Sequence, residues 1–218
     1  MNLKLGFFIS LILLYFMYDT ILTHFYKVKN KRDDYYLGGN APDEIQRFFG
    51  KAEYLVMVYY FFVLIALVFK FDFWGFITLI RILEIKVIQI TGFILGVLAL
   101  VFMTLARLNL GKAWRVGLDY QTKDGLVTSG FYKYMRNPYF TFLLTFQFLL
   151  ILVVPTAIMV FAFIQSLLLL NLQVRQDEVF LQNKYGESYT LYRNRTGRFF
   201  PGFKRHSAFS NSVGDKLC

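Results

Sequence analysis

The sequence predicts an all-α integral membrane protein of about five transmembrane helices. Of its 218 residues, 56% are hydrophobic and only 17% are charged, whereas soluble domains usually carry about 25% charged residues. The apolar residues also occur in long blocks separated by charged stretches, as membrane spans and their loops do. Lipid is therefore the expected solvent for most of the chain.

Three apolar blocks predict the first three spans, at about 3–22, 52–71 and 86–108. The first block lacks a small-x-small cleavage motif after it, which favours a retained span over a removed signal peptide. In the polar loop that follows, Pro42 and Glu44 mark a helix start. The stretch 73–85 is apolar but short and contains Arg81 and Glu84. It is expected to be an interfacial helix, because a full crossing needs about 20 residues.

The last apolar block predicts a tight helical hairpin. Pro155 divides it into 139–154 and 156–172, each barely one membrane thickness long. The chain is polar from Gln173 onward, and 204–218 has the composition of a disordered tail. The expected organisation is therefore three spans in 1–108, a functional core of loop, hairpin and polar tail in 109–203, and the tail 204–218.

Lysine and arginine gather on one side of the predicted spans. Most lie in 24–51, in 109–137 and after 173, and the positive-inside rule assigns that side to the cytoplasm. With five spans, the N-terminus is then outside and the C-terminus cytoplasmic. The net charge of +10 is accordingly read as membrane topology and contact with anionic lipid, and nucleic acid is not an expected partner.

Metal and disulfide chemistry is not expected. Cys218 is the only cysteine, and the two histidines, His24 and His206, lie far apart in the sequence. The predicted spans also have almost no ionisable residues near their middles, which argues against a transport pathway. Asp19, near the end of the first span, is expected to face an interface.

Polar residues instead gather at the cytoplasmic ends of the third, fourth and fifth spans. They form two clusters, in 111–139 and 175–201. Because a closed hairpin joins its two ends, we expect these clusters to meet in space. This meeting point is the candidate functional site.

The residues of these clusters resemble a known family. The stretches GKAWRVGLD, DGLVTSGFYKYMRNPYF and QVRQDEVFLQNKYGESYTLYRNRTGRFFP are similar to the isoprenylcysteine carboxyl methyltransferase and phospholipid methyltransferase superfamily. Shared features are Leu-Val-Thr-x-Gly-x-Tyr, Arg-(His/Asn)-Pro, a pair of carboxylates and a final Arg-Phe-x-Pro. The resemblance covers about 110–201. The WRVGLD run is most similar to bacterial members, which implies a bacterial inner membrane.

The resemblance implies an S-adenosylmethionine pocket at the cytoplasmic face, formed by the ends of the last two spans and the tail. This cofactor carries a carboxylate, an ammonium, a ribose diol and an adenine around a sulfonium, so its pocket needs a cation, an anion and hydrogen-bonding groups. The adenine is expected between apolar and aromatic walls. The expected cofactor-binding residues are Leu126, Val127, Tyr132, Arg136, Asn137, Pro138, Asp177, Glu178, Tyr185 and Arg198.

Two residues are expected to act in catalysis. Arg175 would steer an anionic nucleophile, and Glu178 would take a proton from an amine nucleophile. A lipid-like or small hydrophobic acceptor would enter from the bilayer while the cofactor enters from the cytosol. A carboxylate, an amine, a thiol and a quinone-like lipid all remain open as acceptors, and the oligomeric state is open too.

Several motif residues also have a purely structural interpretation. Asn137 and Pro138 fit the N-cap and first position of a helix, and Gly130 and Gly186 fit turns or caps. Arg136 has the alternative of anchoring the chain at the interface.

Three positions depart from the family pattern. Asn137 replaces a common histidine, Phe140 a common tyrosine and Asp177 a glutamate, which indicates a divergent substrate. Two other functions stay open, an NADPH-dependent membrane reductase of similar topology and a non-catalytic membrane adaptor.

Overall fold

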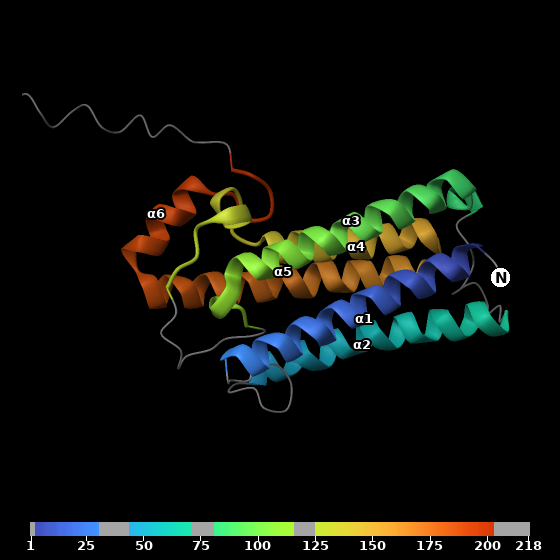
Figure 1. Cartoon of the computed structure of the whole chain (residues 1–218), viewed down its shortest axis with the longest axis horizontal. Helices are drawn as coiled ribbons and strands as arrows, with labels where there is room; N and C mark the ends of the chain where they lie inside the picture. The colour runs from blue at the N-terminus through green and yellow to red at the C-terminus, as the bar shows by residue number, and fades with distance from the viewer. Residues whose placement is uncertain (1–2, 31–43, 71–80, 116–124, 203–218) are drawn as a thin grey trace, which may run out of the picture.

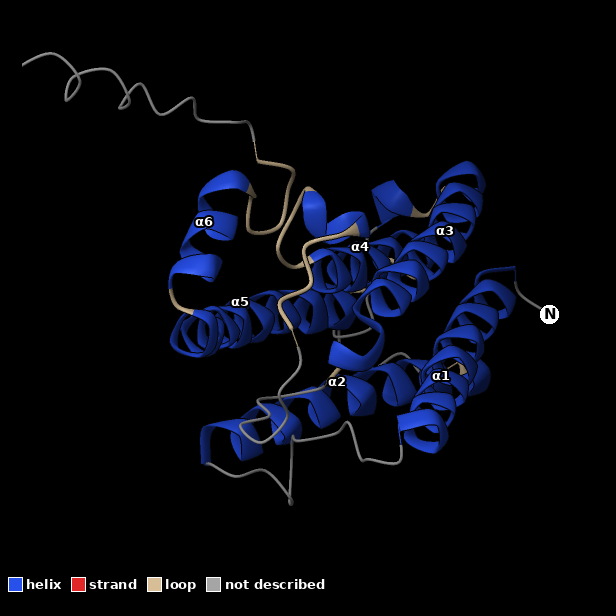
Figure 2. Ribbon diagram, turned by 60° about the vertical axis from the view of Figure 1, so that its left-hand side comes forward, coloured by secondary structure: helices blue, strands red, loops and turns tan. Residues whose placement is uncertain are grey.

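The computed structural model describes residues 3–30, 44–70, 81–115 and 125–202, which are predominantly helical (Figure 2). Short 3-10 turns, η2 (Arg81–Leu83), η3 (Gly111–Ala113) and η4 (Gly130–Lys133), connect or extend the helices. Within the described ranges, the β structure is a single isolated bridge between Met135 and Gly197. The helices are α1 (Leu3–Asn30), α2 (Glu44–Phe69), α3 (Lys86–Leu110), α4 (Pro138–Val153), α5 (Ala157–Tyr185) and α6 (Glu187–Arg195).

The predicted all-α integral membrane fold is confirmed. Four helical segments are long and apolar enough to cross a membrane, namely α1, α2, α5, and α3 together with η3. Helix α4 is apolar but has only 16 residues, so at 1.5 Å per residue it is about 24 Å long. It is the short arm of the predicted hairpin, which turns at Val154 and Pro155.

Two helices extend well beyond the predicted spans. Helix α1 continues to Asn30 and α5 to Tyr185, although the hydrophobic blocks end near 22 and 172. In α5 the extension contains three glutamines together with an arginine, a glutamate, a leucine and a lysine, all of which favour helix in water. The helix ends only at Gly186, whose φ of 54° suits a glycine cap. Asp177 and Glu178 therefore lie within α5, which corrects the predicted end of this span.

Other boundaries agree with the sequence or lie outside the described residues. Helix α2 begins at Glu44, the predicted helix start. Most of the predicted interfacial helix at 73–85 and all of the predicted tail at 204–218 lie outside the described residues, and the described part of the former contains the turn η2.

The helices form two layers (Figure 1). Helices α3, α4 and α5 lie together, and α1 and α2 form a second layer against them. Fully buried apolar side chains fill the junction between the layers, among them Phe8, Leu11, Val63, Met103 and Leu150. Many large apolar side chains on the outside are exposed, such as Leu13 and Phe61, as expected of surfaces that contact lipid.

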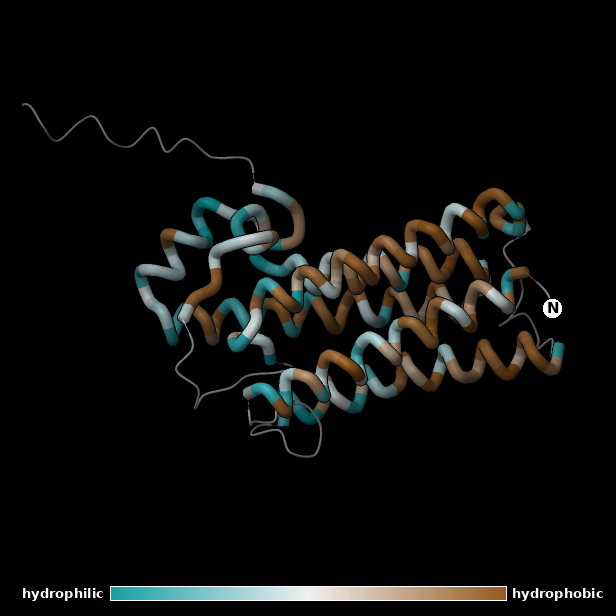
Figure 3. The backbone as a smooth tube through the Cα atoms, in the orientation of Figure 1, coloured by the Kyte–Doolittle hydropathy of each residue, from teal (hydrophilic) through white to brown (hydrophobic). Residues whose placement is uncertain are grey.

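The two ends of the bundle differ in polarity. Hydrophobic residues occupy the middle, and hydrophilic residues gather around α6, at the end opposite the N-terminus (Figure 3). At the N-terminal end, Lys4 forms an ion pair with Glu84, which joins α1 to the segment before α3. The polar end of the bundle therefore contains the candidate functional site.

Two glycines of α3 permit its close packing against both layers. A Cβ on Gly92 would lie 2.9 Å from the Cβ of Leu152 and 3.2 Å from the carbonyl oxygen of Leu149, both in α4. A Cβ on Gly96 would lie 3.1 Å from a terminal methyl group of Leu11 in α1. Small residues of this kind allow helix backbones to approach closely within a membrane. Helix α3 therefore packs closely both on α4 in its own layer and on α1 in the other layer.

The two glycines should respond differently to substitution by alanine. In Gly92→Ala the new methyl group meets backbone and Cβ atoms, which cannot rotate away, so overpacking should destabilise the protein by about 1–3 kcal/mol. In Gly96→Ala the methyl group meets the end of a leucine side chain, and the better helix propensity of alanine offsets the cost. Apparent Tm values in detergent should fall clearly for Gly92→Ala and little for Gly96→Ala. Equal values would contradict this account of the packing.

Candidate functional site

At the polar end, the segment before α4 is paired with the segment after α6. The backbone N–H groups of Arg136 and Asn137 donate to the carbonyl oxygens of Gly197 (2.9 Å) and Arg198 (3.1 Å). Further along, the N–H of Gly202 donates to the carbonyl oxygen of Tyr134 at 3.3 Å. Two segments some sixty residues apart in sequence are thereby joined, and the predicted meeting of the two polar clusters is confirmed.

A contact with α3 fixes the position of η4. The side-chain oxygen of Asn109 accepts a hydrogen bond from the N–H of Phe131 at 3.0 Å. Gly130 has a φ of 60°, and a Cβ there would lie 2.0 Å from the same oxygen. Glycine is therefore required by both conformation and space, and its predicted role in a turn is confirmed.

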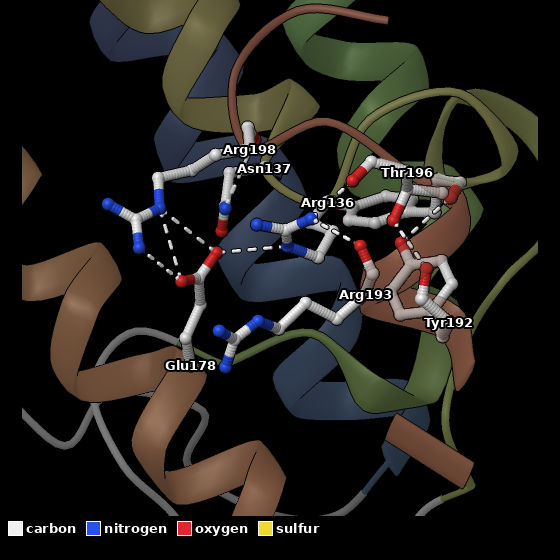
Figure 4. Close-up of polar contacts among 8 residues, drawn as sticks. Arg136, Asn137, Glu178, Tyr192, Arg193, Thr196 and Arg198 are labelled. Carbon is white, nitrogen blue, oxygen red and sulfur yellow. Dashed lines mark hydrogen bonds and ion pairs between the residues drawn. The ribbon is translucent and has the colours of Figure 1, made fainter. Parts of the chain in front are cut away.

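A carboxylate with two arginines lies at the centre of this assembly (Figure 4). The Oε1 of Glu178 accepts from Nε of Arg136 at 3.0 Å, and Oε2 accepts from Nη2 of Arg198 at 2.6 Å. The side chain of Glu178 is 8% exposed and that of Arg136 10%, whereas that of Arg198 is 37% exposed. Charge-assisted hydrogen bonds in such a sheltered place are strong. They connect α5 to the start of α4 and to the segment 196–202, which follows α6.

Further hydrogen bonds extend the same network. Arg136 also donates through Nη1 to the carbonyl oxygens of Arg193 (3.0 Å) and Thr196. The hydroxyl of Tyr192 donates to the carbonyl oxygen of Tyr132 at 2.7 Å (Figure 4). Helix α6 is thus held over η4, and Arg136 is far more constrained than a side chain that only anchors the chain at an interface.

The expected helix cap at Asn137 differs in its details. Asn137 occupies the N-cap position of α4 and Pro138 follows in the first turn, as predicted, but the asparagine side chain makes no cap hydrogen bond to that turn. Its amide instead donates to the carbonyl oxygen of Arg198 at 3.2 Å. The predicted N-cap position is therefore confirmed, while the side chain of Asn137 bonds to the segment that follows α6.

A cavity of about 490 Å³ opens beneath the network and extends between the two helix layers. Of the predicted binding residues, Glu178, Arg198 and Pro138 are absent from its described lining. Glu178 nevertheless holds Arg136 in place, and Arg198 in turn donates to Glu178. Arg175 is exposed on α5 and is likewise absent from that lining. The predicted residues that do line the cavity are Leu126, Val127, Tyr132, Arg136, Asn137, Asp177 and Tyr185.

Several buried polar atoms around the cavity have no hydrogen-bond partner among the described residues. Among them are the hydroxyl of Tyr189, the ring nitrogen of Trp114 and the Nε of Arg115. All three residues line the cavity. Since buried polar groups are nearly always satisfied in native proteins, these donors indicate a polar ligand.

The tyrosines of α6 are neutral hydrogen-bonding groups. Burial raises the pKa of Tyr189 to about 12 and also raises the pKa of Tyr192 above its ordinary value. Both hydroxyls therefore keep their protons at neutral pH. The Tyr192 hydroxyl is used inside the protein, which leaves that of Tyr189 for a ligand.

Sequence reasoning missed the residues that α3 and its extension contribute. Arg107 is 1% exposed and donates to Asp19 at 3.0 Å and to Thr23 at 2.8 Å, both in α1. Its guanidinium lies 4.5 Å from the centre of the Trp114 ring, a cation–π contact. The sequence did contain a signal for this pair, because Arg107 and Asp19 are charged residues near the same end of two different apolar blocks. Asp19 is half exposed, as an interface position predicts, but it also lines the cavity.

Comparison with known proteins agrees with this location of the site. Residues 90–183 match the model of the isoprenylcysteine carboxyl methyltransferase (ICMT) family, and a search of curated proteins found no match. The matched segment contains most of α3, η4, α4 and nearly all of α5, and therefore Arg136, Asp177 and Glu178. Residues 90–183, which include most of the candidate site, are thus similar to the ICMT family of membrane methyltransferases.

Proposed function

We propose that this protein transfers the methyl group of S-adenosylmethionine to a lipid-like or small hydrophobic acceptor. The observation that carries the proposal is the single cavity shared by a polar wall and an apolar wall. The polar wall comes from η4, the start of α4, the end of α5 and α6. The apolar wall comes from Phe16 of α1, Val56 and Met57 of α2, and the leucines of α4 and α5 that line the cavity. A water-soluble cosubstrate and an apolar one can thus meet in one place.

The residues present fit this cosubstrate. Arg115 offers a cation and an unsatisfied donor, Asp177 an anion, and Tyr189 a neutral hydroxyl donor. Tyr132 and Tyr185 supply the aromatic surfaces that an adenine needs. A volume of about 490 Å³ lies within the range of about 300–1,000 Å³ that ligand pockets occupy.

The chemistry asks little of the protein beyond alignment. The bound cofactor supplies an activated methyl group on a positively charged sulfur that leaves as a neutral thioether. The side chains around it have to hold the acceptor, the methyl group and the sulfur in line and keep water out. Such positioning can contribute up to roughly 7–11 kcal/mol to lowering a barrier. The bonds that fix Arg136, Glu178 and Tyr192 make the polar wall rigid enough for this task.

The proposal includes a topology, with α6 and the site in the cytoplasm, the N-terminus outside and a bacterial inner membrane as the location. Lys27, Lys29, Lys112 and Lys133 lie near the ends of segments at the α6 end of the bundle. This distribution supports the positive-inside assignment. It also gives the cosubstrate direct access from the cytosol, while the acceptor arrives from the surrounding membrane lipid.

Binding of S-adenosylmethionine to the detergent-purified protein tests the proposal. Asp177→Asn keeps the shape of the side chain and removes its charge, so the cofactor Kd should rise about tenfold or more. Arg175→Ala is the matched control from the same helix, because Arg175 is exposed and absent from the described cavity lining. It should leave Kd unchanged. Equilibrium dialysis with labelled cofactor measures both values, and no binding at millimolar cofactor would refute the function.

Removal of the Glu178 charge should release the segment 196–202 from α5. Breaking a buried ion pair costs about 3–5 kcal/mol, and the loss in Glu178→Gln should lie toward the lower end because Arg198 is partly exposed. We expect a lower apparent Tm, weaker cofactor binding and faster proteolysis within 196–202. Glu187→Gln, at an exposed glutamate of α6, is the control and should behave like the wild type. Unchanged proteolysis in Glu178→Gln would show that the tail is held by other contacts.

A further inference from the structure

Glu53 is a carboxylate that the site described so far does not use. It belongs to α2, outside the segment that matches the family, and it lines the cavity. The described residues offer its side chain no hydrogen bond and no ion pair. A partly buried carboxylate without a partner is unfavourable, so its position requires an explanation.

The other charges on the cavity wall already have opposite charges beside them. Asp19 is paired with Arg107 and Arg136 with Glu178. Asp177 experiences the positive charge of Arg115. Among the described residues, the charged groups that act on Glu53 are the carboxylates of Asp177 and Asp19. The cavity next to Glu53 is therefore a place of negative potential and attracts a cation.

Two buried side chains independently indicate a ligand in the same cavity. Gln147 of α4 is 7% exposed and Ser166 of α5 is 4% exposed. Both line the cavity, and the amide oxygen of Gln147 and the hydroxyl of Ser166 have no hydrogen-bond partner among the described residues. An amide oxygen and a carboxylate both accept hydrogen bonds. The missing ligand group is consequently a hydrogen-bond donor.

The neighbouring wall is apolar. Val56 and Met57 of α2, Leu143 of α4 and Leu169 and Leu170 of α5 line the same cavity. They lie within or next to the membrane-spanning parts of their helices. A ligand that carries its donor group on a hydrocarbon chain would match both kinds of wall.

We infer that Glu53 binds the methyl acceptor, and that this acceptor is an amine attached to an apolar chain. The inference rests on the proposed function and adds the class of its second substrate. It differs from the carboxyl group that the family name describes, because a carboxylate beside Glu53 would face a like charge. The residue that selects the acceptor is then outside the family-matched segment.

The reaction balances with these groups. The acceptor binds as an ammonium ion, and its proton passes to the Glu53 carboxylate. The nitrogen lone pair then attacks the methyl carbon of the sulfonium donor, so that an N–C bond forms and the S–C bond breaks. The bonding pair goes to sulfur, which becomes a neutral thioether. The proton on Glu53 leaves to water.

A binding experiment tests the inference without turnover. Dodecylamine, which is protonated at neutral pH as a lysine side chain is, should raise the apparent Tm of the detergent-solubilised protein more than dodecanoate or dodecanol. Butylamine should act weakly, because it lacks the chain that the apolar wall binds. In Glu53→Gln the concentration of dodecylamine needed for half-maximal protection should rise about tenfold or more. Glu44→Gln, at an exposed glutamate of the same helix, should retain the wild-type preference.

The outcomes separate the two proposals when the binding of S-adenosylmethionine is measured in parallel. Cofactor binding together with an amine preference that depends on Glu53 supports both. Cofactor binding with equal protection by amine, acid and alcohol, or with an amine preference that Glu53→Gln retains, overturns the acceptor inference alone. Failure of the cofactor to bind overturns the proposed function, and the role of Glu53 in methyl transfer falls with it.

The labelled product gives a second readout. Membranes from cells that produce the protein are supplied with S-adenosylmethionine labelled in the methyl group. An N-methyl product should resist alkaline hydrolysis and bind to a cation exchanger, and its amount should fall at least tenfold with Glu53→Gln. Label released by alkali as methanol indicates a methyl ester, and label in an uncharged, alkali-stable product indicates a methylated thiol or hydroxyl. Either result overturns the inference.

Discussion

The structure depends on one buried carboxylate that has to be neutralised from two directions. Glu178 projects from α5 into a place with little water, and its two arginines come from the start of α4 and from the tail. Together they offset the cost of a sheltered charge, which without partners would be several kcal/mol. The polar end of the molecule is consequently assembled as a unit, in which α6, η4 and the tail adopt their positions together.

The unequal lengths of α4 and α5 bring Glu178 next to Arg136. Helix α4 has 16 residues and α5 has 29, so α5 projects about 20 Å further along the hairpin axis. Its last turns carry Asp177 and Glu178 beyond the end of α4, next to the segment that precedes it. If the two helices were equally long, α5 would end before Asp177 and Glu178. Arg136, in the segment before α4, would then have no carboxylate beside it.

Much of this arrangement was readable from the sequence. Blocks of apolar residues identify the spans, and Pro155 identifies the hairpin turn, because both signals are local. The end of α5 was not predicted, since hydropathy marks the membrane boundary and Gly186 marks the helix boundary. The pairing of Asp19 with Arg107 and the orientation of Glu53 depend on how α1 and α2 pack against α3 and α5. No spacing along the chain encodes that packing.

The cavity is walled by two layers that differ in their relation to the family. The matched segment contributes α3, α4 and α5, whereas α1 and α2 precede it in the chain. Each layer supplies its own side of the same space. Mutations in the first two helices can thus reshape one side of the chamber while the other side keeps its chemistry. Such a division would allow the acceptor to change through mutations in α1 and α2 while the residues of the family-matched segment stay the same.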